Sequence, residues 1–188
     1  MTTSKVMETN SKPCSAEPPS VLPYTDVKPV GAADFYAAVN ATFRFIERKL
    51  GTDGLLRYWT DLGKTYYAPV TQRWQAGGLA AVAAHWRAFF AAEPGAVVEV
   101  TEAENEVVVE VRTCPAIKFL RDHDREIVPV FCHHCYHVST AIGAPSGIEV
   151  RVKGGNGACT QRFAKTGHFP APQHEADIAL AGAEASNG

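Results

Sequence analysis

Four of the five cysteines lie in the second half of the chain, and they are the side chains best suited to chemistry: Cys114, Cys132, Cys135 and Cys159. A cysteine thiolate is both a nucleophile and a soft metal ligand. Cys132 and Cys135 have the C-x-x-C spacing that supplies two ligands to zinc or to an iron–sulfur cluster, whereas the other two lack a paired spacing. Two chemistries therefore stay open: a metal site made by all four thiolates, or a pocket in which one activated thiolate attacks a substrate.

Cys114 stands between a predicted strand and Pro115. Because proline is favoured at the first position of a helix, Cys114 is predicted to be the N-cap residue. The free N–H groups and partial positive charge of a helix N-terminus stabilise a thiolate, so we expect a lowered pKa for Cys114. The alternative is a thiol packed in the core at the end of a strand.

The segment 131–137 contains the densest group of ligand side chains. On a helical wheel Cys132 and Cys135 flank the apolar stripe, so both are predicted to face the sheet. His133 and His137 point away from it; as an i, i+4 pair they can share a metal ion, and the simpler interpretation is two solvated histidines. Three neighbours are candidate substrate-binding residues: His134, Tyr136 and Ser139.

Cys159 begins the last predicted strand and shares a face with Gln161 and Phe163. If that face points inward, Cys159 lies in the same layer as the predicted helix over residues 129–142. The four thiols are therefore predicted to meet in one pocket between a helical layer and two hairpins.

The elements that position these thiols follow from hydrophobic periodicity. The first half has helical spacing, with glycines between the segments, and predicts helices over 34–50, 53–62 and 79–92. Later, alternating valines predict two β-hairpins, 96–101 with 106–113 and 148–153 with 158–163, separated by helices over 115–122 and 129–142. The predicted fold class is α+β: a helical N-terminal half packed on an antiparallel sheet of two β-hairpins, with two intervening helices.

Composition divides the chain into three parts. Residues 1–30 are polar and Pro-rich and are predicted to be a disordered leader that includes Cys14. Residues 31–166 are predicted to be a single α+β domain, and residues 167–188, rich in Ala, Gly and Glu, a loose C-terminal tail.

Charge and hydropathy narrow the classes of partner. The net charge of −2 excludes a general attraction to nucleic acid, and no apolar run has the length of a membrane span or a secretory signal. We therefore expect a cytoplasmic protein with reduced thiols and a small-molecule substrate, without nucleic-acid or membrane partners. The sequence leaves open whether the protein forms a homo-oligomer.

Three cysteine-containing segments resemble the L-2-amino-thiazoline-4-carboxylic acid hydrolase family. They are Cys114-Pro115 after a strand, Phe131-Cys132 near a helix start, and the stretch 157–163 with its Gly-turn-Cys. The likeness spans about residues 31–166, with Leu62-Gly63 in the helical half. Cys135 stands where the family commonly has Asp.

The resemblance implies hydrolysis of a cyclic isothiourea carboxylate to N-carbamoyl-L-cysteine, in which water adds at the carbon between sulfur and nitrogen. Such a reaction needs an acid/base group and a cation for the carboxylate, but Arg112 and Arg162 are predicted to point outward. The leading hypothesis is a small hydrolase that opens a C–N or C–S bond through the cysteine-rich site. The alternatives are a cysteine-lined sensor of a metal or small ligand, and a metal-cluster-dependent lyase or reductase.

Overall fold

The computed structural model describes residues 30–182. Of the predicted leader only Val30 lies in this range, so Cys14 lies outside it. The described residues form four α-helices: α1 (Phe35–Lys64), α2 (Ala68–Ala91), α3 (Pro115–Asp122) and α4 (His133–Gly143). The strands are β1 (Val97–Glu102), β2 (Glu106–Thr113), β3 (Ile148–Gly155), β4 (Ala158–Lys165) and β5 (Ile178–Ala179). Three short 3-10 turns are η1 (Pro129–Cys132), η2 (Ala144–Ser146) and η3 (Glu175–Asp177).

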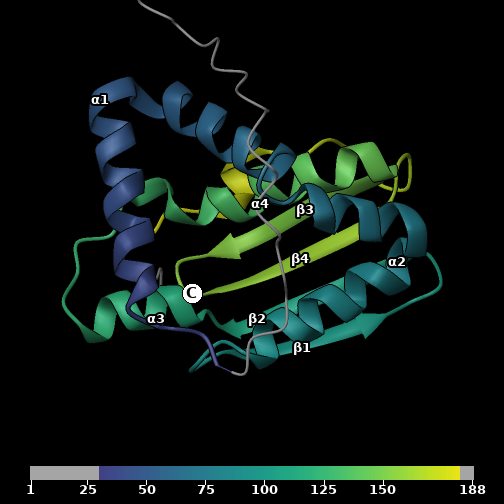
Figure 1. Cartoon of the computed structure of the whole chain (residues 1–188), viewed down its shortest axis with the longest axis horizontal. Helices are drawn as coiled ribbons and strands as arrows, with labels where there is room; N and C mark the ends of the chain where they lie inside the picture. The colour runs from purple at the N-terminus through teal and green to yellow at the C-terminus, as the bar shows by residue number, and fades with distance from the viewer. Residues whose placement is uncertain (1–29, 183–188) are drawn as a thin grey trace, which may run out of the picture.

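The strands form one sheet in the order β1-β2-β4-β3-β5 (Figure 1). Both predicted hairpins are present, and antiparallel pairing of β2 with β4 joins them, with Val109 opposite Gln161. The short strand β5 adds in parallel to β3. The predicted α+β class is confirmed.

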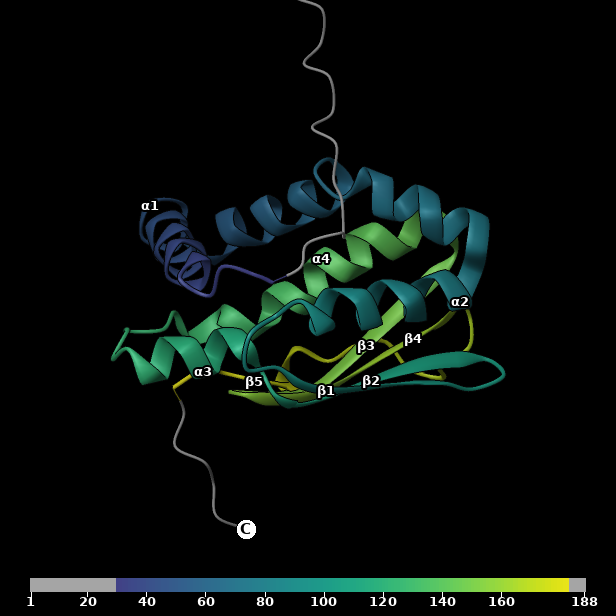
Figure 2. The same ribbon diagram turned by 60° about the horizontal axis from the view of Figure 1, so that its bottom comes forward.

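Helices α1, α2 and α4 lie on one side of the sheet, and α3 lies beside one end of it (Figure 2). Helix α4 packs on β3 and is itself covered by α1, whereas α2 covers β1 and β2. The alternation in β2 sets this arrangement: Val107 and Val109 are fully buried beneath the helices, while Arg112 on the other face pairs with Glu99 at 2.8 Å. No helix among the described residues is long and apolar enough to span a membrane.

Glycines bend the two long helices where the sequence predicted breaks. Gly51 has φ 68° and Gly78 has φ 57°, conformations that residues with a Cβ rarely adopt. The predicted helices over 34–50 and 53–62 are therefore two arms of α1, and α2 begins well before residue 79, with Pro69 in its first turn. Asp34 is the N-cap of α1, but its side chain makes no capping hydrogen bond.

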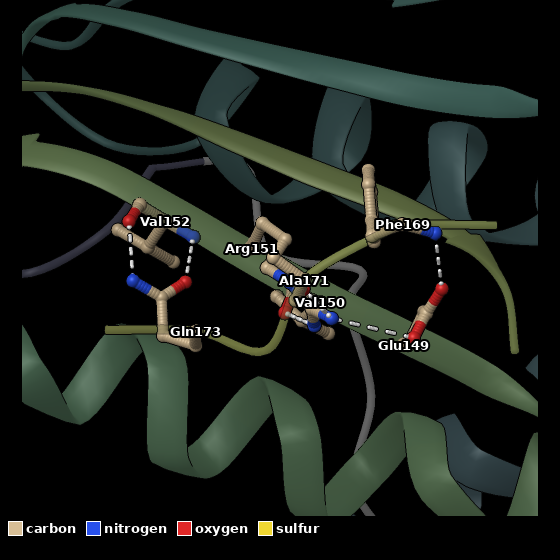
Figure 3. A network of polar contacts seen from close by, with 7 residues as sticks. All are labelled: Glu149, Val150, Arg151, Val152, Phe169, Ala171 and Gln173. Atoms are coloured by element: carbon tan, nitrogen blue, oxygen red, sulfur yellow. Dashed lines mark hydrogen bonds and ion pairs between the residues drawn. The ribbon is translucent and has the colours of Figure 1, made fainter. Parts of the chain in front are cut away.

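The segment after β4 runs back along β3, where a loose tail was expected from residue 167 (Figure 3). The side-chain amide of Gln173 bonds both backbone groups of Val152, at 2.8 and 2.9 Å. Arg151 donates to the Ala171 carbonyl at 2.7 Å, and the Phe169 N–H donates to Glu149 at 2.9 Å. Because these bonds come from side chains rather than from a long strand, hydrophobic periodicity gave no signal for them.

Candidate functional site

A cavity of about 150 Å³ lies between the sheet and helices α2, α3 and α4, and all four predicted cysteines line it. Its wall also contains six aromatic side chains: Tyr36, Tyr67, Trp86, Phe89, Phe90 and Phe131. No Asp, Glu, Lys or Arg belongs to that lining. The four thiols therefore line one pocket, as the sequence predicted, and this pocket is mainly apolar.

Cys114 is the N-cap of α3, as predicted, with extended backbone angles and its N–H bonded to the Gly157 carbonyl at 2.8 Å. The predicted lowering of its pKa is wrong. Burial raises the pKa to about 11, although hydrogen bonds from the backbone of Ile117 and Ala116 favour the thiolate. The loss of hydration in the cavity therefore outweighs the helix N-terminus.

The other three thiols are also neutral near pH 7. Burial raises the pKa of Cys132 and of Cys135 to about 12, and it raises the pKa of Cys159 as well. The Asn156 N–H donates to Cys132 Sγ at 3.2 Å, and Gln161 Nε2 donates to Cys159 Sγ at 3.8 Å. All four are free thiols.

A metal centre does not fit this arrangement. Within residues 30–182, no three His, Cys, Asp or Glu side chains are grouped so that they can hold a metal ion. The four thiols line a cavity instead of closing on one point, whereas zinc needs each sulfur at about 2.3 Å from the ion. The zinc or iron–sulfur site that the four thiols suggested in the sequence is therefore not supported.

His134 and Cys135 form a nucleophile–base pair in the cavity wall. His134 Nδ1 contacts the Phe131 carbonyl, which can only accept, so Nδ1 carries the proton. Nε2 is then the acceptor, and it lies 3.6 Å from Cys135 Sγ. Burial lowers the pKa of His134, which keeps the ring neutral. The pair is therefore a neutral thiol facing a neutral imidazole.

His133 and His137 are not the solvated pair that the helical wheel suggested. His133 is only 7% exposed, and its Nε2 lies 3.3 Å from Glu175 of η3. His137 Nε2 lies 3.5 Å from the same carboxylate, and its ring stacks on Trp59 of α1. A helical wheel cannot show that α1 and η3 cover this face of α4. The two rings share a carboxylate here, and no metal site is found at them.

Of the three candidate substrate-binding residues, His134 and Ser139 line the cavity, whereas Tyr136 does not and packs edge-on against His137. Sequence reasoning did not identify the aromatic wall from α2 or the buried Gln161, which is 2% exposed. Its position on the inward face beside Cys159 and Phe163 was a usable signal, since a polar residue there must be buried. Arg162 points outward, as expected, and pairs with Glu106.

Comparison of this chain with models of known families, with curated proteins and with solved structures gave no match. The likeness to the thiazoline carboxylate hydrolases therefore depends only on the cysteine segments themselves.

Proposed function

We propose that this domain binds a small, neutral and largely apolar molecule in the cysteine-lined cavity. The observation that carries the proposal is the cavity wall, which is rich in aromatic rings and contains no Asp, Glu, Lys or Arg. A volume of about 150 Å³ suits a single ring, since an apolar protein cavity of about this size accommodates benzene.

The same wall argues against a charged ligand. An ion moved from water into an apolar cavity loses its hydration, and here it gains no opposite charge from the lining. The carboxylate of a cyclic isothiourea carboxylate would face this cost. A neutral ligand is therefore favoured over the substrate that the family resemblance implies.

Thermal unfolding of the full chain with toluene or with benzoate tests this proposal, since the two ligands share a ring and differ in charge. We expect toluene to raise the melting temperature and benzoate to leave it unchanged. Ala116→Leu, which adds atoms to the cavity wall, should abolish the toluene shift, measured against the variant's own melting temperature. Lys118→Leu on the exposed side of α3 should preserve it. Equal shifts with benzoate, or a toluene shift that survives Ala116→Leu, contradict the proposal.

A second candidate function is thiol-dependent hydrolysis of a C–N or C–S bond, and the His134–Cys135 pair supports it. His134 Nε2 would take the thiol proton as Cys135 Sγ attacks the electrophilic carbon. The imidazolium would then return that proton to the departing nitrogen or sulfur, and water would hydrolyse the thioester to release the acid and the free thiol.

The test of this candidate is a burst assay with p-nitrophenyl acetate in a Cys14→Ser background. If Cys135 is the nucleophile, Cys135→Ala loses the burst and the acetylated protein in the mass spectrum, whereas Cys132→Ala, which removes a neighbouring thiol, keeps both. A burst that persists in Cys135→Ala removes this candidate.

A further inference from the structure

Gln161 Oε1, an acceptor, and Trp86 Nε1, a donor, have no hydrogen-bond partner among the described residues. Both atoms are buried, and both residues line the cavity. A buried polar atom without a partner costs free energy, so an atom of this kind in a cavity wall indicates a ligand that pairs with it.

Gln161 is held so that its oxygen is the atom left over. It lies on β4, between Val109 of β2 and Val152 of β3, and is 2% exposed. Its Nε2 donates to Cys159 Sγ at 3.8 Å. With the amide nitrogen engaged at the wall, Oε1 is the half of the amide that remains for a ligand.

Trp86 and Gln161 line the same cavity. The Trp86 ring packs on that of Phe163, at 5.7 Å between centroids, and Phe163 is the next inward-facing residue of β4 after Gln161. Residues two apart on a strand are separated by about 7 Å. A single small ring can therefore reach both the acceptor and the donor.

We propose that the ligand is a neutral ring with a polar group that donates a hydrogen bond to Gln161 Oε1 and accepts one from Trp86 Nε1. This deepens the proposed binding function and rests on it. A cyclic amide, whose N–H adjoins its C=O, has this chemistry. The thiols nearby are weak partners, so the amide oxygen and the indole N–H are the atoms that discriminate between rings.

Calorimetric titration of the full chain with four probes tests the inference: toluene, 2-pyridone, 3-methyl-2-pyridone and N-methyl-2-pyridone. The two methylated pyridones have the same size, but only the N-methyl compound lacks the donor. We expect 3-methyl-2-pyridone to bind about tenfold more tightly than N-methyl-2-pyridone, since a ligand without the N–H leaves Gln161 Oε1 unpaired.

Two variants assign the atoms. Gln161→Met should remove the difference between the two methylated pyridones, and Trp86→Phe should weaken all pyridones by similar factors while leaving toluene binding nearly unchanged. Gln72→Met, on the exposed side of α2, serves as the control and should behave as the parent.

The outcomes separate the two proposals. If toluene binds but the methylated pyridones bind equally, or the difference survives Gln161→Met, the inference about the polar group is wrong and the binding function stands. If none of the four probes binds, both are wrong.

Discussion

His134 Nε2 lies 3.6 Å from the Sγ atom of Cys135, its immediate neighbour in the chain. Adjacent residues on a helix do not ordinarily face each other, but here the first turn of α4 follows η1. The bond from His134 Nδ1 to the Phe131 carbonyl of η1 turns the ring back toward the cavity. The geometry of this pair thus depends on the 3-10 turn as much as on the helix.

The first prediction concerns acid. Burial lowers the pKa of His134 and of His137, so the unfolded chain takes up these protons before the native protein does. Stability is therefore lost as the pH falls below the ordinary value of 6.5, by at most about 1.4 kcal/mol per pH unit for each group. Urea unfolding at pH 7.5 and pH 5 should show this loss.

His134→Gln should be less sensitive to acid than the parent. His168→Gln, at an exposed position, should match the parent. Equal acid sensitivity in parent and His134→Gln would show that this ring does not titrate as the structure implies.

The second prediction concerns alkali. The thiols keep their protons in the native protein up to a pKa of about 11 for Cys114 and about 12 for Cys132, but the unfolded chain loses them near 9. Stability therefore falls as the pH rises above 9. Unfolding in reductant at pH 8 and pH 10 should show a smaller fall for Cys132→Ala than for the parent. The contributions of all other groups are common to the two proteins, so they cancel in this comparison.

The third prediction concerns the contact between α1 and α4. A Cβ added at Gly63 would lie 2.6 Å from Ala141 Cβ and 2.7 Å from the Val138 carbonyl. Gly63→Ala should therefore destabilise the fold by about 1–3 kcal/mol, as overpacking does, in urea unfolding. Gly63→Ala with Ala141→Gly removes one of the two clashes and should recover part of the loss. A stability equal to that of the parent in Gly63→Ala would mean that the helices pack less closely than described.

The fourth prediction concerns the segment that runs along β3. Gln173→Leu removes two hydrogen bonds to Val152, each worth about 1 kcal/mol. We expect the Val152 amide to exchange faster with deuterium, while Val109 in the centre of the sheet keeps its protection. Unchanged exchange at Val152 would show that the backbone of the segment, not this side chain, holds it.

The sequence predicted most of the fold because its signals are local. Alternating valines in β2 and the inward face of Cys159, Gln161 and Phe163 identify both hairpins, and glycines mark the bends of α1 and α2. The convergence of the thiols could be predicted because each lies at an element end or on a core-facing stripe.

The parts that sequence reasoning missed depend on tertiary contacts. The sign of the Cys114 pKa shift reflects how deeply this thiol is buried, which outweighs the effect of the α3 N-terminus. Burial of His133 and His137 comes from α1 and η3, far away in the chain. The strand β5 has only two residues, too few for a period to appear.

Strand β5 also lies beside Gly155 and Cys132. The Ala179 carbonyl lies 2.6 Å from where a Gly155 Cβ would be, and the Ala181 N–H donates to the Pro129 carbonyl at 2.7 Å. A chain shortened after residue 166, the boundary that composition suggested, would leave β3 as an open edge with unpaired N–H and C=O groups. An exposed edge strand can pair with the edge strand of a second copy. We therefore expect the shortened protein to aggregate under conditions in which the longer protein does not.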